Sequence, residues 1–270
     1  MIPLAYIREW RQWAPWTEDA QIEQDLIICR ALIEIFSHPV LSEELAFRGG
    51  TALFKLHLTP LRYSEDIDLV QVHAAPIGSI MDALRERFNR WLGQPRRSMS
   101  EGRVTLTYRM ESENGLALRL KVEINSREHF TILGLEKRRF DVNSRWYSGT
   151  ALISAYHLEE LLGTKVRALC QRKKGRDLFD LWTAFRTTDA RPESVINCFV
   201  QYMENEGHKI SRAEFEQNLS EKLGDPRFLD DIGPLVVKDS GWDLKEAAEF
   251  ALDVMAVHLP GNPWKGKKRS

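Results

Sequence analysis

The sequence has few cysteines and no long apolar run, and both shortages limit what the protein can be. Only three cysteines, Cys29, Cys170 and Cys198, occur in 270 residues, too few and too scattered for a disulfide-stabilised secreted fold. No Cys/His spacing is typical of a zinc site. The N-terminus, MIPLAYIREWRQWAPW, has charges and tryptophans where a signal peptide needs an apolar run. These patterns predict a cytoplasmic protein with reduced thiols and no membrane span.

The chain also lacks an excess of charge of either sign, internal repeats and low-complexity segments. Its formal net charge is −1, which argues against a protein that coats nucleic acid along its whole surface. A local basic cleft remains compatible with this balance. The 43% of hydrophobic residues is ordinary for a globular protein, and the length allows one large domain or two lobes.

Hydrophobic periodicity predicts an α+β first half and a helical second half. In the first half we expect helices over 17–38, 49–57 and 75–93, and strands over 65–72, 103–110 and 116–125. Asn114-Gly115 is a strong hairpin signal between the last two strands. After Gly149 the expected helices cover 155–171, 176–186, 192–206, 211–222 and 243–258. The sequence therefore predicts two lobes, 1–149 with a small mixed sheet and 150–270 all helical.

The most informative stretch is FRGGTALFKLHLTPLRYSEDIDLVQV, residues 47–72. On a strand, Asp66 and Asp68 point to one face while Ile67 and Leu69 point to the other. Two neighbouring carboxylates repel each other unless a cation lies between them. Oxygen ligands favour Mg²⁺ or Mn²⁺ over zinc. An alternating pair of acids is also typical of a solvated strand face, so this interpretation depends on the surrounding residues.

Two further features strengthen the metal interpretation. Glu123 alternates with the apolar residues of strand 116–125 and could complete a carboxylate triad, the arrangement that holds two metals in phosphoryl transfer. An ordinary exposed strand acid would look the same. Gly49 and Gly50 would let backbone approach a phosphate, and Thr51 adds a hydroxyl at the start of the next helix.

In the second half, Lys165 falls within the apolar stripe of its expected helix. Such a lysine either extends outward along apolar surface or points into a cleft, where it could hold nucleotide phosphates. Asp177 begins the next helix and could orient Lys165 or a nucleotide sugar. It could equally be an acid favoured by the helix dipole.

Together, RGGTALFK, RYSEDIDL and the later block LLGTKVRALCQRKKGRDLFDLW resemble the AbiEii/AbiGii toxin family of nucleotidyltransferases. The resemblance covers about residues 20–185, with Glu123 where aspartate is frequent. It implies a polymerase-beta-like nucleotidyltransferase lobe followed by a helical lobe that closes the active-site cleft.

The resemblance also implies an activity and its residues. The protein would be the toxin of a toxin–antitoxin or abortive-infection system, transferring a nucleotide from a nucleoside triphosphate to an RNA hydroxyl, most often of tRNA, with a cognate antitoxin as partner. Catalysis would use Asp66, Asp68, Glu123, Lys165 and Asp177, the first three as metal ligands; nucleotide contacts would come from Gly49, Gly50, Thr51, Lys55, Arg62, Ser64 and Lys165. Nucleotidylation of a protein and a non-catalytic module that binds nucleoside triphosphate are the alternatives.

Two aromatic features remain outside this interpretation. Trp10, Trp13 and Trp16 lie three residues apart and are expected to pack rather than to stack on bases. The C-terminal stretch PGNPWKGKKRS, residues 260–270, is basic and could neutralise RNA, but it is also typical of a frayed terminus.

Overall fold

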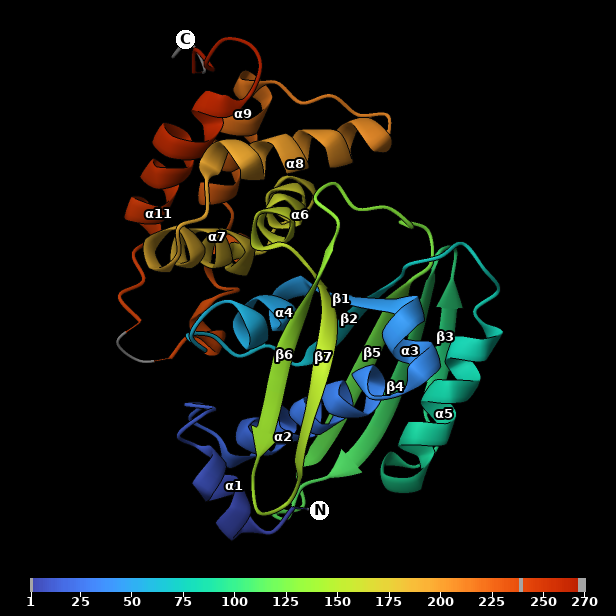
Figure 1. Cartoon of the computed structure of the whole chain (residues 1–270). Coiled ribbons are helices and arrows are strands. Elements are labelled where there is room, and N and C mark those ends of the chain that lie inside the picture. The colour runs from blue at the N-terminus through green and yellow to red at the C-terminus, as the bar shows by residue number, and fades with distance from the viewer. Residues whose placement is uncertain (1, 238–239, 267–270) are drawn as a thin grey trace. The chain divides into compact units, whose positions relative to one another are not determined.

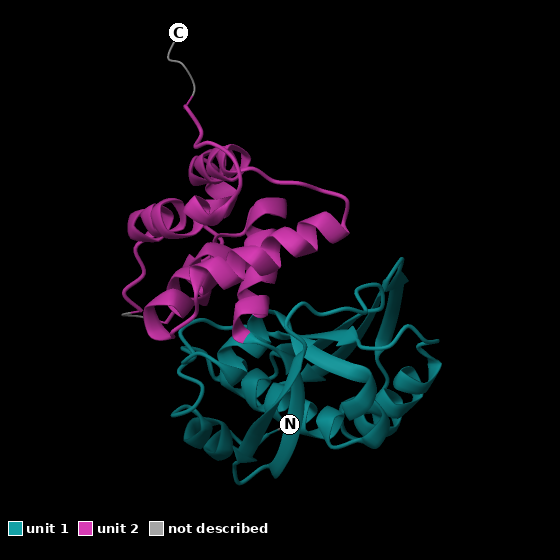
Figure 2. Ribbon diagram, turned by 45° about the horizontal axis from the view of Figure 1, so that its top comes forward, with its two compact units in different colours: residues 1–157 teal, residues 158–270 magenta. Residues whose placement is uncertain are grey.

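The structure is a computed structural model that describes residues 2–237 and 240–266. The chain divides into two compact units, Met1–His157 and Leu158–Ser270, which are coloured separately in Figure 2. The first unit is α+β and the second is helical, as the periodicity predicts. The division falls after the expected position near Gly149, because strand β7 (Ser148–Tyr156) continues the sheet of the first unit. The last four residues of the basic C-terminal stretch lie outside the described residues.

The first unit is built on one seven-stranded sheet with the order β3-β4-β5-β2-β1-β7-β6. Its strands are β1 (Leu45–Arg48), β2 (Asp66–Gln71), β3 (Arg96–Ser100), β4 (Arg103–Glu111), β5 (Ala117–Asn125), β6 (Leu135–Asn143) and β7. β2 pairs with β5 in parallel and with β1 in antiparallel orientation, so β2 lies in the middle of the sheet. β1, β3, β6 and β7 are strands that the sequence patterns do not predict.

Helices of the first unit are α1 (Leu4–Trp10), α2 (Asp19–Phe36), α3 (Pro39–Glu44), α4 (Gly49–Leu56) and α5 (Gly78–Leu92). In Figure 1, α2 crosses β6 and β7. It contacts the sheet at β5, β6 and β7, and α5 contacts it at β4. The apolar stripe of α2, including Ile22, Leu26 and Leu32, is fully buried. Burial of this stripe against the sheet is the main reason that α2 is stable as a helix.

The second unit contains α6 (Leu158–Gln171), α7 (Gly175–Thr187), α8 (Pro192–Asn205), α9 (Arg212–Leu223), α10 (Pro226–Leu229) and α11 (Leu244–Phe250). Short helical turns lie between α10 and α11 at Gly233–Leu235, and after α11 at Ala251–Met255 and Ala256–His258. α6 packs against both α7 and α8. Gly163 permits the approach of α8, because a Cβ there would lie 2.7 Å from the Cβ of Cys198. α6, the helix that carries Lys165, therefore lies in the core of this unit.

Two of the three cysteines and two of the three N-terminal tryptophans are buried. All three cysteines are free, and burial raises the pKa of Cys29 to about 12, so this thiol stays protonated near neutral pH. Trp10 and Trp16 are buried, as expected for packing residues, whereas Trp13 is 60% exposed. Within the described part of the chain, every helix is too short or too polar to span a bilayer.

We expect acid to destabilise the first unit through His57, at the end of α4. Burial, assisted by the nearby Arg138 and His157, lowers the pKa of His57 from 6.5 to about 4, against an opposing effect of Glu136. Between these pKa values the unfolded chain binds a proton that the folded chain does not, so the unfolding free energy falls as the pH drops from 6.5 towards 4. His57→Gln should therefore lose less stability than the wild type between about pH 7.5 and about pH 5 in urea titrations. An equal loss in both proteins would show that His57 does not carry this effect.

Candidate active site

β2 places two carboxylates side by side in the middle of the sheet. Ile67 and Leu69 are buried on one face, at 0% and 1% exposure. Asp66 and Asp68 occupy the other face, where both are partly exposed. The strand thus has the alternation that the sequence indicates, with its carboxylates on the face opposite the apolar residues.

β5 lies beside β2, as the triad hypothesis requires. In the parallel register, Asp68 is opposite Glu123 and Asp66 is opposite Lys121. Leu120, Val122 and Ile124 of β5 are fully buried, so Lys121 and Glu123 share the face of the two aspartates. Gln24 of α2 fixes the start of this strand pair, because its amide nitrogen donates to the backbone carbonyls of Arg119 at 2.6 Å and Glu65 at 3.4 Å.

Lysine and arginine side chains already contact these carboxylates. The ammonium of Lys121 forms a close ion pair with Glu123 and lies 3.8 Å from Oδ2 of Asp66. Arg103 of β4 lies 3.5 Å from the other oxygen of Glu123. Burial raises the pKa of Asp66 to about 6; Lys121 opposes this shift, and the charge of Asp68 adds to it. The carboxylates therefore repel each other, and Lys121 compensates only in part.

The carboxylate oxygens of Asp66 and Asp68 are placed to bind a hard divalent cation, whereas Glu123 is not placed to join them. Asp66 and Asp68 supply adjacent carboxylate oxygens, the ligands that Mg²⁺ and Mn²⁺ prefer. Over the described ranges, no group of three or more His, Cys, Asp or Glu side chains converges to hold a metal ion. Glu123 lies opposite Asp68 but is held by Lys121 and Arg103. The expected three-carboxylate site is therefore only partly assembled: the two aspartates fit a cation, and Glu123 would have to leave its cationic partners to join them.

The Gly49-Gly50 turn lies directly against this face. Gly49 has a φ of +82°, and a Cβ there would lie 2.1 Å from Oδ2 of Asp68. A Cβ on Gly50 would lie 2.5 Å from a terminal nitrogen of Arg62 and 3.3 Å from the hydroxyl of Ser64. Only glycine permits both close approaches. The turn thus brings the backbone at the start of α4, the guanidinium of Arg62 and the Asp68 carboxylate into one small region.

Thr51 and Ser64 hold this region together. The Thr51 hydroxyl donates to the backbone carbonyl of Asp66 at 2.5 Å, and the Thr51 and Ser64 hydroxyl oxygens are 2.8 Å apart. Arg62 is 3% exposed, and its guanidinium donates to the carbonyl of Tyr63 and lies over the ring of Phe54. Thr51 therefore has a structural role that links α4 to β2. Ser64 and Arg62 border the same region, where the resemblance places nucleotide contacts.

Gly49→Ala should abolish most activity, beyond any effect of its loss of stability. The added Cβ would displace the Asp68 carboxylate, and a displacement of about 1 Å at a catalytic group can reduce turnover about hundredfold. Gly134→Ala is a matched control, since Gly134 has a φ of +83° but open space where a Cβ would lie, with no neighbouring atom within 4 Å. Both variants place alanine at a positive φ and should lose stability, and Gly49→Ala should lose more because its Cβ also meets Asp68. Equal activity in the two variants would contradict the packing of Gly49 on Asp68.

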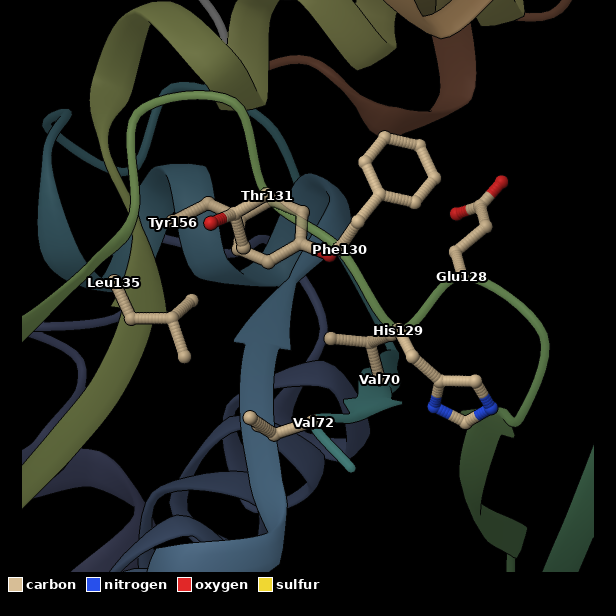
Figure 3. Close-up of a pocket in the computed structure, with 8 residues that line it drawn as sticks. All are labelled: Val70, Val72, Glu128, His129, Phe130, Thr131, Leu135 and Tyr156. Atoms are coloured by element: carbon tan, nitrogen blue, oxygen red, sulfur yellow. The ribbon is translucent and has the colours of Figure 1, made fainter. Parts of the chain in front are cut away.

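Arg48 is a basic residue of this region that the sequence patterns do not single out. It lies opposite Asp68 in the β1–β2 register and forms a close ion pair with Glu128. Burial opposes its charge, but Glu128 and, more weakly, Asp68 raise the pKa of Arg48. Figure 3 shows the adjacent cavity of about 110 Å³, to which the β5–β6 connection contributes Glu128, His129, Phe130 and Thr131. Only the strand register identifies Arg48, because Asp68 lies far from it in sequence.

Lys55 lies in a different environment from the one expected. Its ammonium forms a 2.6 Å ion pair with Asp25 of α2. Asp25 also accepts hydrogen bonds from the indoles of Trp10 and Trp16, at 2.9 and 3.4 Å. Both side chains of the ion pair are largely buried. The charge of Lys55 thus helps to hold α1, α2 and α4 together, and its expected nucleotide contact stays a prediction.

Lys165 and Asp177 come together inside the second unit. The Lys165 ammonium lies 2.7 Å from Asp180 and 3.4 Å from Asp177, and both aspartates are fully buried. Arg172 also binds Asp177, with two hydrogen bonds of 2.7 Å. The Lys165 side chain is only 8% exposed, so it does not extend outward along the surface. It forms a buried ion pair that joins α6 to α7.

Comparisons with known proteins address the family and the fold of this chain. Residues 30–250 match the family described as "Nucleotidyl transferase AbiEii toxin, Type IV TA system". Among solved structures, the fold is similar to that of MenT4, a nucleotidyltransferase toxin from Mycobacterium tuberculosis H37Rv, with 17% identity and a TM-score of 0.63 over 96% of this chain and 90% of that one. It is also similar to JHP933 from Helicobacter pylori, with 17% identity and a TM-score of 0.54 over 89% and 91% of the two chains.

At these identities the structural likeness shows the shared fold alone. A search of the curated proteins finds no match. The family match, however, covers most of the chain, including β1, β2, β5 and the helices that carry Lys165 and Asp177. This chain therefore belongs to the AbiEii family of nucleotidyltransferase toxins, of type IV toxin–antitoxin systems.

Proposed function

We propose that this nucleotidyltransferase transfers a nucleoside monophosphate from a nucleoside triphosphate to a hydroxyl of RNA, with tRNA as the acceptor. The observation that supports this most is the packing of the Gly49-Gly50 turn on Asp68 and Arg62. It puts backbone amides at the start of α4 and a buried guanidinium beside paired carboxylates. Amides at a helix start and a guanidinium bind phosphate, and carboxylates attract the cation that accompanies a triphosphate.

The residues that would hold a Mg²⁺ or Mn²⁺ ion are Asp66 and Asp68, with Glu123 joining them once it leaves Lys121. When bound, this cation supplies neutralisation of the triphosphate charge. The chain itself would bind and orient the nucleotide through Gly49, Gly50, Arg62 and Ser64. Arg48, opposite Asp68 in the sheet and paired with Glu128, borders the same region.

The reaction needs one bond made and one broken. The acceptor hydroxyl oxygen bonds to the α-phosphorus, the bond from the α-phosphorus to the pyrophosphate oxygen breaks, and pyrophosphate leaves. Asp68 or Glu123 takes the proton of the hydroxyl. Since the protein forms no covalent intermediate in this scheme, its contribution is positioning and charge stabilisation.

For Lys165 and Asp177 we propose a structural role. Their buried ion pair with Asp180 favours a role in holding α6 and α7 in a fixed arrangement. A direct contact of Lys165 with the nucleotide is a separate hypothesis, and the two can be separated by experiment. As a type IV toxin, the protein has an antitoxin as its counterpart; we place both in the cytoplasm.

A labelled nucleoside triphosphate can identify the acceptor, because the label stays on the molecule that receives the nucleotide. The toxin should be incubated with each α-labelled nucleoside triphosphate, Mg²⁺ and a cell extract, and the products digested separately with ribonuclease and protease. We expect label in a discrete RNA of tRNA size that ribonuclease destroys and protease leaves intact. Label that resists ribonuclease and disappears with protease would instead support nucleotidylation of a protein. Membership of a nucleotidyltransferase family already speaks against a non-catalytic module.

A further inference from the structure

The β3–β4–β5 part of the sheet has one open face on which basic side chains collect. β4 and β5 bury Val104, Leu106, Tyr108, Leu120, Val122 and Ile124 on one face. In the strand register, the residues of the other face include Arg96, Arg103, Arg109, Arg119 and Lys121. Glu111 and Glu123 are the acids of this face within the three strands. Arg103 and Arg119 have side chains 58% and 64% exposed, so the basic groups are accessible to solvent.

The same register connects this basic face to the two aspartates. One row runs from Arg96 on β3 through Thr107 and Lys121 to Asp66 on β2. The next row runs from Ser98 through Thr105 and Glu123 to Asp68. Three strand spacings separate β3 from β2, which is about 14 Å and the length of about four stacked nucleotides. The face therefore forms a continuous surface that ends at the candidate active site.

The charges on this face are only partly compensated within the protein, since Glu123 is shared by Lys121 and Arg103. Arg109 and Arg119 lie directly opposite each other in the β4–β5 ladder. Like charges at such positions destabilise a sheet. Arg119 has one acidic neighbour, Glu65 at 3.5 Å, and for Arg96 and Arg109 the described residues include no ion-pair partner. Such an arrangement is unfavourable in isolation and becomes favourable when an anion binds across the strands.

We propose that this face, defined by Arg96, Arg103, Arg109, Arg119 and Lys121, binds the phosphate backbone of the acceptor RNA. The proposal rests on the proposed function for the identity of the acceptor, and it adds the surface along which the RNA reaches Asp66 and Asp68. Arginine, lysine and hydroxyl side chains are the usual partners of backbone phosphates. Ser98, Thr105 and Thr107 supply hydroxyls between the basic groups. This face leads directly to Asp66 and Asp68, where the end of an acceptor RNA must react. That favours RNA over an acidic protein as the partner.

The test compares two double variants that remove the same charge. Arg96→Ala with Arg109→Ala changes the proposed face at the two arginines that form no ion pair within the described residues. Arg85→Ala with Arg90→Ala changes α5, whose Phe88 packs on the buried face of β4 through Tyr108 at 5.5 Å. All four arginines are exposed, so both proteins should fold. Fluorescein-labelled unfractionated tRNA serves as the probe, in EDTA and without nucleotide, over a range of salt concentrations.

We expect the Arg96/Arg109 variant to bind tRNA about tenfold more weakly and with a salt dependence shallower by about 1.5 to 2 in log–log slope, since two phosphate contacts are lost. The Arg85/Arg90 variant should bind within about twofold of the wild type. Equal affinities and slopes in the two variants would overturn the proposal and leave the face to a protein partner. Absence of measurable tRNA binding by the wild type would overturn it as well.

This binding assay is independent of the transfer reaction. If tRNA binds through the face but no label is transferred to RNA, the proposed function fails while the binding surface stands. If RNA is labelled normally by the Arg96/Arg109 variant, with an unchanged KM for tRNA, the surface fails while the proposed function stands. We expect a raised KM for tRNA and an unchanged KM for the nucleoside triphosphate.

Discussion

Asp68→Asn should reduce nucleotidyl transfer about thousandfold without unfolding the protein, a loss of the size seen when a charge-stabilising group is removed from an active site. The substitution keeps the shape of the side chain beside Gly49 and removes only its charge. Because Asp68 also repels Asp66, the unfolding free energy should stay constant or rise slightly. Transfer to RNA and urea unfolding, measured on the same preparations, check both parts.

Asp82→Asn is the matched control for this experiment. Asp82 lies on α5 with a side chain 77% exposed, paired with Arg85 at 2.8 Å. An exposed pair of this kind contributes little, so the control should keep full activity and stability. Full activity in a folded Asp68→Asn protein would remove the two aspartates from the reaction.

Lys165→Met should destabilise the protein by about 3 to 5 kcal/mol, because removal of one partner from a buried ion pair leaves the other charge poorly compensated. Methionine keeps most of the side-chain volume, so cavity formation adds little. Urea unfolding monitored by tryptophan fluorescence measures the change. Lys245→Met is the control, since Lys245 is 85% exposed and 3.7 Å from Glu249, and it should be close to neutral.

The double variant Lys165→Met with Asp180→Asn separates structure from nucleotide binding. Removing Asp180, the carboxylate closest to Lys165, together with the lysine should restore much of the lost stability, because Asp177 keeps its pairing with Arg172. If this protein then binds nucleoside triphosphate like the wild type, Lys165 acts only by holding the two helices together. Loss of binding in a stable double variant would instead support the phosphate contact implied by the family resemblance. Equal stability of Lys165→Met and Lys245→Met would show that the ion pair is not needed.

Local signals are enough to predict the centre of the site. The alternation of Asp66 and Asp68 with apolar residues and the Gly49-Gly50 pair depend on a few neighbouring residues, and the structure places them together. The α+β first half and the helical second half also follow from local periodicity. The position of Glu123 opposite Asp68 requires only that the two strands be neighbours.

The unpredicted parts depend on contacts between distant residues or on weak local patterns. Every residue of β3 and most residues of β6 are exposed, so neither strand has an apolar face to detect. The helix expected over 155–171 overlaps the end of β7. Lys121 opposite Asp66 and Arg48 opposite Asp68 follow from register, which no local pattern specifies. The sequence singles out Lys55 and Lys165, but their partners Asp25 and Asp180 lie on other helices.

Above all, we propose that the site formed by the β2 carboxylates and the Gly49-Gly50 turn catalyses transfer of a nucleotidyl group rather than a phosphoryl group. The most direct measurement supplies the wild-type protein with tRNA, Mg²⁺ and nucleoside triphosphate labelled at either the α- or the γ-phosphate. We predict that α-label enters the RNA, that γ-label is released as pyrophosphate, and that Asp68→Asn abolishes both. Transfer of the γ-label to RNA, or α-label transfer that persists in Asp68→Asn, would contradict it.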